Sequence, residues 1–117
     1  MVTILKDTTM TQKQIDYFNN LKPFKSFSDI PEIPIFTNDE EYQIVVSNII
    51  RCGAIPKDKL EIGATYKGKC RNSIMATWDG DMFEYPREKF GHKYTEKINC
   101  FEDYTDYDVF VPFEKIN

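Results

Sequence analysis

Basic residues alternate along two neighbouring stretches of the chain. Lys67, Lys69 and Arg71 are two residues apart, and Arg87 and Lys89 repeat that spacing. Residues two apart on a β-strand point to one face, so five such cations on one sheet could converge on a phosphate or another anion. Arginine would offer a phosphate two parallel hydrogen bonds, and lysine a point charge. The alternative is a solvated polar face whose lysines protect an edge strand from pairing.

Aromatic residues interleave with these cations and favour a planar ligand. Trp78, Tyr85 and Tyr94 could stack on a nucleobase, whose flat face any aromatic ring can cover. The predicted ligand-binding site combines basic, amide and aromatic side chains: Lys69, Arg71, Asn72, Trp78, Tyr85, Arg87 and Lys89.

A second candidate surface is acidic. Glu102, Asp103, Asp106 and Asp108 precede the last expected strand. Carboxylates at this density could hold a hard cation, but the run lacks the fixed ligand spacing around a glycine that a calcium loop needs. It could instead bind a basic protein partner through its charge. The simplest alternative is that the run is solvated.

Histidine and cysteine spacing argues against metal binding and nucleophilic catalysis. The chain has one histidine, His92, and three widely separated cysteines, Cys52, Cys70 and Cys100. Zinc sites usually contain closely spaced ligand pairs, and no such pair occurs here. A dyad of Cys100 and His92 would lack an orienting third group. We therefore expect no metal, no cofactor and no catalytic residue, and we expect the thiols to be buried.

The bulk composition limits the class of protein. We expect residues 1–117 to form a single domain, because this length supports one modest core. A net charge of −4 argues against general nucleic-acid binding, which needs a basic surplus to displace counterions. No apolar run reaches the length of a signal peptide or a membrane span. The expected location is the cytoplasm, without membrane contact.

Two helices are expected in the first half of the chain. Thr11–Gln14 matches a capping box and predicts a helix that ends before Pro23. Thr37–Glu40 matches another and predicts a second helix that ends at Gly53. Between them, residues 24–36 should form an irregular connector because prolines interrupt it. The apolar residues at helical spacing are Ile15, Phe18 and Leu21 in the first helix, and Tyr42, Val45, Val46, Ile49 and Ile50 in the second.

Strands should dominate the second half, organised around a hairpin. Asp79-Gly80 between two alternating apolar runs predicts a two-residue turn, which would place Trp78 opposite Asp81 and Ala76 opposite Phe83. On this register the drier face, which should meet the helices, contains Ile74, Ala76, Trp78, Phe83 and Tyr85. The expected strands are Ala64–Arg71, Ser73–Trp78, Met82–Phe90 and Tyr107–Phe113.

The predicted fold class is α+β, with two N-terminal helices packed on a four-stranded, mostly antiparallel sheet. Residues 1–56 form the helical N-terminal part and residues 57–117 the β-rich part. Pro86 cannot donate to a ladder and therefore predicts an edge or a bulge. Gly91-His92 should form a turn that is followed by a polar loop. A small sheet with a spare face often covers it by dimerising, so a homodimer is one expected assembly.

The second half resembles a family of small accessory domains encoded by phages and bacteria. The shared residues are Gly63, Tyr66, Cys70-Arg71-Asn72, Trp78, Tyr85, Arg87, Lys89-Phe90-Gly91, Ile98, Glu102-Asp103, Asp108, Phe110 and Pro112. The resemblance covers residues 57–113, so both helices lie outside it. This chain departs from the pattern at Cys100, where a histidine is expected, and at Pro86.

The resemblance implies a non-enzymatic phage-type protein that counteracts a host defence system in the host cytoplasm. It would do so by binding a phosphorylated, nucleotide-derived ligand through the basic and aromatic site. One alternative is an inhibitor that binds a host defence enzyme through the acidic residues Glu102, Asp103, Asp106 and Asp108. Another is a small nucleotide-acting enzyme with two carboxylates of different pKa in one cleft. In the third alternative, the protein is a structural part of a larger assembly.

Overall fold

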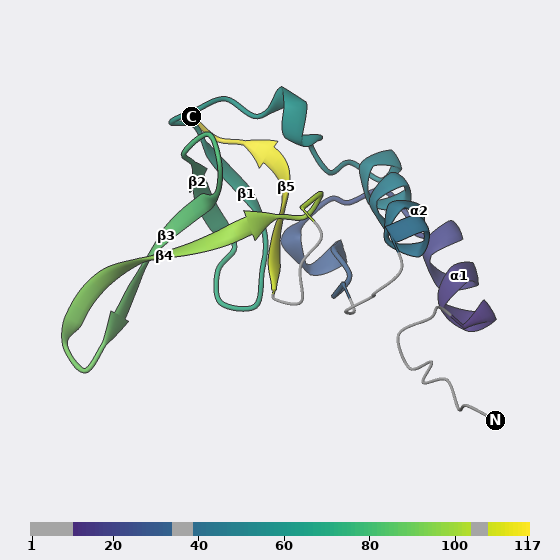
Figure 1. Cartoon of the computed structure of the whole chain (residues 1–117), viewed down its shortest axis with the longest axis horizontal. Coiled ribbons are helices and arrows are strands. Elements are labelled where there is room, and N and C mark those ends of the chain that lie inside the picture. Colours follow the sequence, from purple (N-terminus) through teal and green to yellow (C-terminus); the bar gives the residue numbers. More distant parts are fainter. Residues whose placement is uncertain (1–10, 34–38, 104–107) are drawn as a thin grey trace.

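Five strands close into a small barrel in the second half of the chain, and two helices pack beside it (Figure 1). The structure is a computed structural model that describes residues 11–33, 39–103 and 108–117. The helices are α1 (Gln12–Asn19) and α2 (Asp39–Arg51), with 3₁₀ turns η1 (Phe27–Asp29) and η2 (Lys57–Lys59). The strands are β1 (Thr65–Lys69), β2 (Met75–Trp78), β3 (Phe83–Lys89), β4 (His92–Cys100) and β5 (Val109–Lys115). The α+β class is therefore confirmed.

The strand order corrects the predicted four-stranded sheet. Strands β1 to β4 form an antiparallel meander, and β5 closes it by pairing antiparallel with β1 and parallel with β4. The strand missed by the sequence is β4, which was expected to be a turn and a polar loop. Residues 92–95 of β4 are all exposed and show no alternation of apolar and polar side chains. A strand that is solvated on both faces carries no periodic hydrophobic signal.

The turn after β2 is two residues longer than predicted. Trp78 pairs with Phe83, and the Asp79 N–H donates to the Met82 carbonyl at 3.0 Å. The Asp79 carboxylate accepts hydrogen bonds from the N–H groups of Asp81 and Met82 at 2.8 and 2.7 Å. These side-chain bonds stabilise the turn. The pairing is shifted by two residues. Because side chains alternate with a period of two, each residue still lies on the face of the sheet that was predicted for it. Four of the five predicted inner residues are buried, and Ile74 is exposed.

The barrel interior is filled by aromatic rings around Phe83. Its ring lies 4.9 Å from Trp78, 6.1 Å from Tyr66 and 4.7 Å from Phe110, measured between centroids. Buried residues of α2 belong to the same hydrophobic cluster. Strands β1 and β5 approach so closely at Gly68 that an added Cβ would lie 2.1 Å from a β5 carbonyl oxygen. Only glycine allows this approach.

The helices follow their local signals. The Thr11–Gln14 capping box is present, α1 ends before Pro23, and Gly53 follows α2 with a φ of 127°. The second capping box at Thr37–Glu40 lies partly outside the described residues. Arg51 donates to carbonyls at the C-terminal end of α1, which ties the two helices together.

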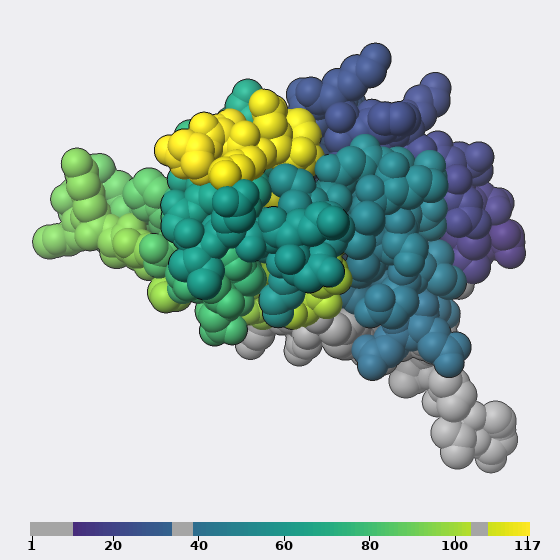
Figure 2. Space-filling model, turned by 90° about the horizontal axis from the view of Figure 1, so that it is seen from above, coloured from purple at the N-terminus to yellow at the C-terminus, as the bar shows by residue number. Residues whose placement is uncertain are grey.

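Strands β3 and β4 extend beyond the barrel as a two-stranded ribbon. Pairing with β2 ends at Glu84, whereas pairing with β4 continues to Lys89 and His92. We call residues 86–95 the β3–β4 arm. Figure 2 shows it projecting from the body at the end opposite to α1. Pro86 lies within this ribbon, where β3 has one neighbour instead of two, so the predicted edge position is confirmed.

Candidate ligand-binding site

Arg71 lies just after β1, between two hollows in the surface. One has a volume of about 190 Å³ and the other about 360 Å³, and both are lined by Arg71 and Asp108. The Asp108 carboxylate, just before β5, accepts a hydrogen bond from the Arg71 backbone N–H. This bond fixes the backbone at Arg71, and Arg71 lines both hollows.

The smaller hollow lies between the segment after η1 and the ends of β1 and β5. The Lys69 ammonium donates to the Ile30 carbonyl at 2.9 Å, so it clamps this segment onto the barrel. Glu32 is an exposed acidic residue at the rim, and Cys70 contributes a buried thiol. Burial is the main reason that the pKa of Cys70 is raised. The hollow therefore presents two cations, but one of them is already engaged by the backbone.

The larger hollow lies beside β3 and β4 and offers mixed hydrogen-bonding groups. Tyr85, Asn72 and Asn99 line it together with Arg71. Burial raises the pKa of the Tyr85 hydroxyl, and contacts with the Arg87 and Asn72 side chains act in the opposite direction. The phenol is consequently neutral near pH 7 and can donate a hydrogen bond. Together these groups can hold a ligand that has both donors and acceptors.

The structure divides the predicted site. Lys69, Arg71, Asn72 and Tyr85 meet around the two hollows. Trp78 is 4% exposed and packs in the barrel core, so its ring is not free to stack on a base in this structure. The remaining two predicted residues, Arg87 and Lys89, belong to β3 beyond the end of its pairing with β2.

Arg87 and Lys89 have other contacts. Arg87 forms an ion pair of 3.7 Å with Glu96 on the paired strand β4. The Lys89 ammonium lies 5.7 Å from the centre of the Phe90 ring at the tip of the arm. Neither residue lines either hollow around Arg71. Arg87 thus contacts two residues that line the larger hollow, Tyr85 and Glu96, whereas Lys89 lies at the tip of the arm.

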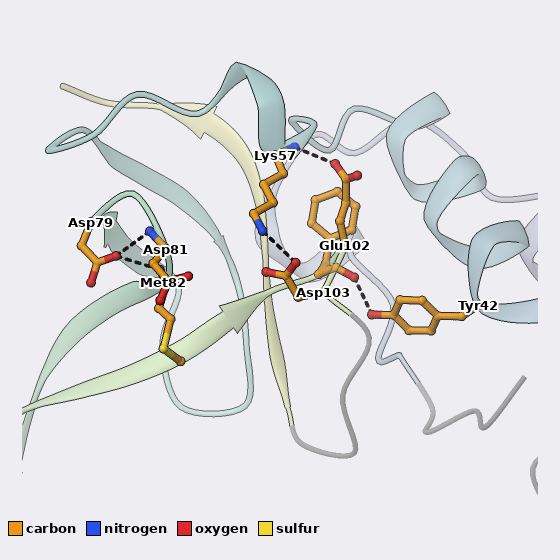
Figure 3. A network of polar contacts seen from close by, with 8 residues as sticks. Tyr42, Lys57, Asp79, Asp81, Met82, Glu102 and Asp103 are labelled. Atoms are coloured by element: carbon orange, nitrogen blue, oxygen red, sulfur yellow. Dashed lines mark hydrogen bonds and ion pairs between the residues drawn. The ribbon is translucent and has the colours of Figure 1, made fainter. Parts of the chain in front are cut away.

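The acidic residues that the structure describes hold the fold together, and Figure 3 shows two of them, Glu102 and Asp103. Glu102 accepts from the Lys57 backbone N–H at 2.6 Å, and Asp103 forms a 2.8 Å ion pair with the Lys57 ammonium. The hydrogen bond with Asp103 is the main reason that the pKa of Lys57 is raised. Asp108 anchors Arg71, and Asp106 lies outside the described residues. The three described carboxylates are thus already engaged, which leaves them less available to a basic partner.

The cysteines and the histidine are separated in the fold. Cys52, Cys70 and Cys100 are buried free thiols, and burial raises the pKa of Cys100 to about 12. His92 is exposed on the arm, outside the barrel core that contains Cys100. Within residues 11–33, 39–103 and 108–117, no three potential ligands of the His, Cys, Asp or Glu type gather closely enough to hold a metal.

Sequence reasoning missed one wall of the larger hollow. Lys97, Ile98 and Asn99 line it from β4, which was expected to be a loop. The available signal was the alternation of the buried Ile98 and Cys100 with the less buried Lys97 and Asn99. Four residues are too short a run to predict a strand unaided.

Comparisons with known proteins add no relative. No family model, curated protein or solved structure matches this chain. No described helix has both the length and the apolar character needed to span a membrane.

Proposed function

We propose that this chain is a non-enzymatic binding protein that holds a phosphorylated, nucleotide-derived small molecule beside Arg71. The observation that carries the proposal is the state of Arg71. Its backbone is fixed by Asp108, and its guanidinium has no ion-pair or hydrogen-bond partner among the described residues. A positioned arginine with free donors is suited to bidentate contact with a phosphate.

The chemistry around Arg71 fits the rest of such a ligand. The amides of Asn72 and Asn99 supply both donors and acceptors, and the Tyr85 hydroxyl adds one more polar group. A volume of about 360 Å³ is within the usual range for small-molecule sites, about 300–1,000 Å³. Phosphate would therefore bind Arg71, while the base or sugar would contact the amides and the phenol.

Binding without turnover is favoured by the position of the reactive groups. The described thiols are buried, and the only histidine of the chain lies on the β3–β4 arm, at the pairing position opposite Lys89. Nucleophilic catalysis needs a nucleophile and a base within hydrogen-bonding reach of each other and of the ligand. His92 and the thiols do not supply such a pair at the hollows beside Arg71.

The biological setting of the proposal is a phage-type accessory protein that acts in the host cytoplasm. It would counteract a host defence system by sequestering a nucleotide-derived signal. The support for this setting is the resemblance of residues 57–113 to phage-encoded and bacterial accessory domains. The guanidinium of Arg71, which has no partner within the described ranges, supports the chemical part of the proposal independently.

Thermal unfolding in the presence of candidate ligands tests the proposal. The panel contains mononucleotides, cyclic oligonucleotides and ADP-ribose derivatives. A ligand present at about 100 times its Kd adds about 2.7 kcal/mol to the free energy of unfolding, which should raise Tm by roughly 10 °C in a domain of this size. The recovered ligand should have an unchanged mass.

The matched control is a cation on β1, the strand that precedes Arg71. Arg71→Ala should abolish the shift, whereas Lys67→Ala should retain it, because Lys67 is exposed on β1 and lines neither hollow. No shift with any member of the panel would contradict the proposal. A ligand of altered mass would replace sequestration with the enzymatic alternative.

A further inference from the structure

The tip of the β3–β4 arm carries an aromatic residue that the fold does not need. Phe90 is 90% exposed and has a φ of 53°, and the following Gly91 has a φ of 78°. With Lys89 paired to His92, these two residues form a type I′ hairpin turn. Asparagine or glycine usually occupies the Phe90 position, because a side chain such as phenylalanine is strained there. An exposed ring on a strained backbone points to a contact outside the molecule.

The arm differs from the rest of the chain in charge. Between residues 86 and 95 there are three basic residues and one acidic residue, a net charge of +2 in a chain whose net charge is −4. The remaining residues therefore carry −6. Lys89 and Lys93 lie on either side of the two-residue turn, and the Lys89 ammonium lies over the Phe90 ring. The tip thus consists of an exposed aromatic ring, Phe90, with the lysines Lys89 and Lys93 beside it.

A third hollow has the complementary character. It measures about 580 Å³, and its apolar lining consists of Ile50, Pro56, Leu60, Ile62 and Trp78. We call it the η2 groove. Ile62 is 77% exposed, and among the large apolar side chains that the structure describes only Phe90 has a larger exposed fraction. Lys57, Asp58 and Glu102 line the same groove. Lys57 is paired with Asp103 and Glu102 accepts from the Lys57 backbone, so the exposed Asp58 supplies the carboxylate that is open to a lysine of the arm.

We propose that the arm tip, residues 89–93, docks into the η2 groove of a second copy of this chain. The exposed Phe90 ring with its flanking lysines would meet an apolar groove beside the exposed carboxylate of Asp58, so both shape and charge favour the contact. The arm extends from the barrel away from the helices, whereas the groove is lined by η2 and by the last turn of α2 (Figure 1). The tip therefore reaches the groove of another molecule and not its own.

Sedimentation equilibrium over a concentration series tests the contact with the protein itself. The wild type should self-associate, and Phe90→Ala should weaken association by at least about tenfold, because truncation of a buried aromatic anchor typically has that effect. Ile62→Lys should weaken it similarly by placing a cation against Lys89 in the groove. Met75→Ala is the matched control, since Met75 is an exposed apolar residue of β2 that lines neither surface.

Mixing the two weakened variants shows whether tip and groove meet. Phe90→Ala retains an intact groove, and Ile62→Lys retains an intact tip, so an equal mixture should associate more strongly than either variant alone. A wild type that remains monomeric across the series would overturn the proposal and leave the tip to a different acidic partner. Association of Phe90→Ala as strong as that of the wild type would overturn it as well.

Discussion

The Asp108 carboxylate accepts a hydrogen bond from the backbone N–H of Arg71. The two residues are 37 positions apart in the chain, and the bond joins the loop after β1 to the residue that precedes β5. Asp108 thereby supports the backbone of the proposed phosphate-binding residue while its charge remains next to the site. Stability and anion affinity should therefore respond differently to changes at this position.

Replacing Asp108 separates its two effects. Asp108→Ala removes the acceptor and should lower the free energy of unfolding by about 1 kcal/mol, as expected for one exposed hydrogen bond. Asp108→Asn retains an acceptor oxygen and removes a negative charge beside Arg71, so it should bind anionic ligands more tightly than the wild type. Urea unfolding measures the first effect and ligand titration the second. Equal stability of Asp108→Ala and the wild type would contradict the anchoring role.

Gly68 should tolerate no larger residue. A Cβ at this position would lie 2.1 Å from the Val111 carbonyl oxygen and 2.8 Å from the Phe110 ring, so Gly68→Ala should destabilise the protein by about 3 kcal/mol. Gly63→Ala is the comparison, because its φ of 87° strains alanine but no atom lies within 4 Å of the added Cβ. That variant should lose only about 1 kcal/mol. Similar losses in the two variants, measured by urea unfolding, would show that β1 and β5 are not so closely packed.

The turn at Asp79 should make stability depend on acid pH. Hydrogen bonds from Met82, from Lys97 and from Asp81 lower the pKa of Asp79 from 3.8 to about 2. A carboxyl with a lowered folded-state pKa contributes stability that is fully present above pH 3.8 and is lost as the pH falls toward 2. Asp79→Asn should therefore show a smaller fall in Tm between pH 4 and 2 than the wild type.

The neighbouring carboxyl provides the control for this pH effect. Asp81→Asn removes an exposed charge from the same turn but leaves the bonds to the Asp79 carboxylate in place. Its fall in Tm over the same pH range should match that of the wild type. If both variants reduced the pH dependence equally, general charge repulsion and not the Asp79 hydrogen bonds would be responsible.

Phe90→Asn should stabilise the folded monomer. Asparagine adopts positive φ more readily than phenylalanine and is preferred before glycine in a type I′ turn, so the free energy of unfolding should rise by about 0.5–1 kcal/mol. The measurement is urea unfolding at a protein concentration low enough to keep the chain monomeric. A less stable variant would indicate that the Phe90 ring contributes to the fold, contrary to its 90% exposure.

The sequence predicted the parts of the fold that are fixed by local chemistry. The capping box at Thr11 and the buried face of α2 depend on residues a few positions apart, and both were predicted correctly. Closure of the barrel depends on pairing between Tyr66 and Lys115, which no local pattern signals. The first part of β4 lies in the solvated arm, so it has no apolar alternation to reveal it.

The candidate site shows the same limit. Alternation along β1 indicated Lys69 and Arg71, and these residues do lie at one hollow. The same reasoning extended the patch to Lys89, but β3 leaves the barrel before that residue is reached. Trp78 was predicted both on the buried face of the sheet and in the ligand site, and the structure buries it in the core. Its ring packs against that of Phe83, with 4.9 Å between the centroids, and offers no exposed surface for stacking in this structure.

The most direct test of the account is isothermal titration of the best ligand from the thermal panel into the wild type, Arg71→Ala and Lys67→Ala. We predict that Arg71→Ala weakens binding by at least about tenfold, since a charge-assisted hydrogen bond contributes about 1.5–3 kcal/mol. Lys67→Ala should bind within about twofold of the wild type, because Lys67 lies outside both hollows. Equal affinity of Arg71→Ala and the wild type would contradict the proposed site.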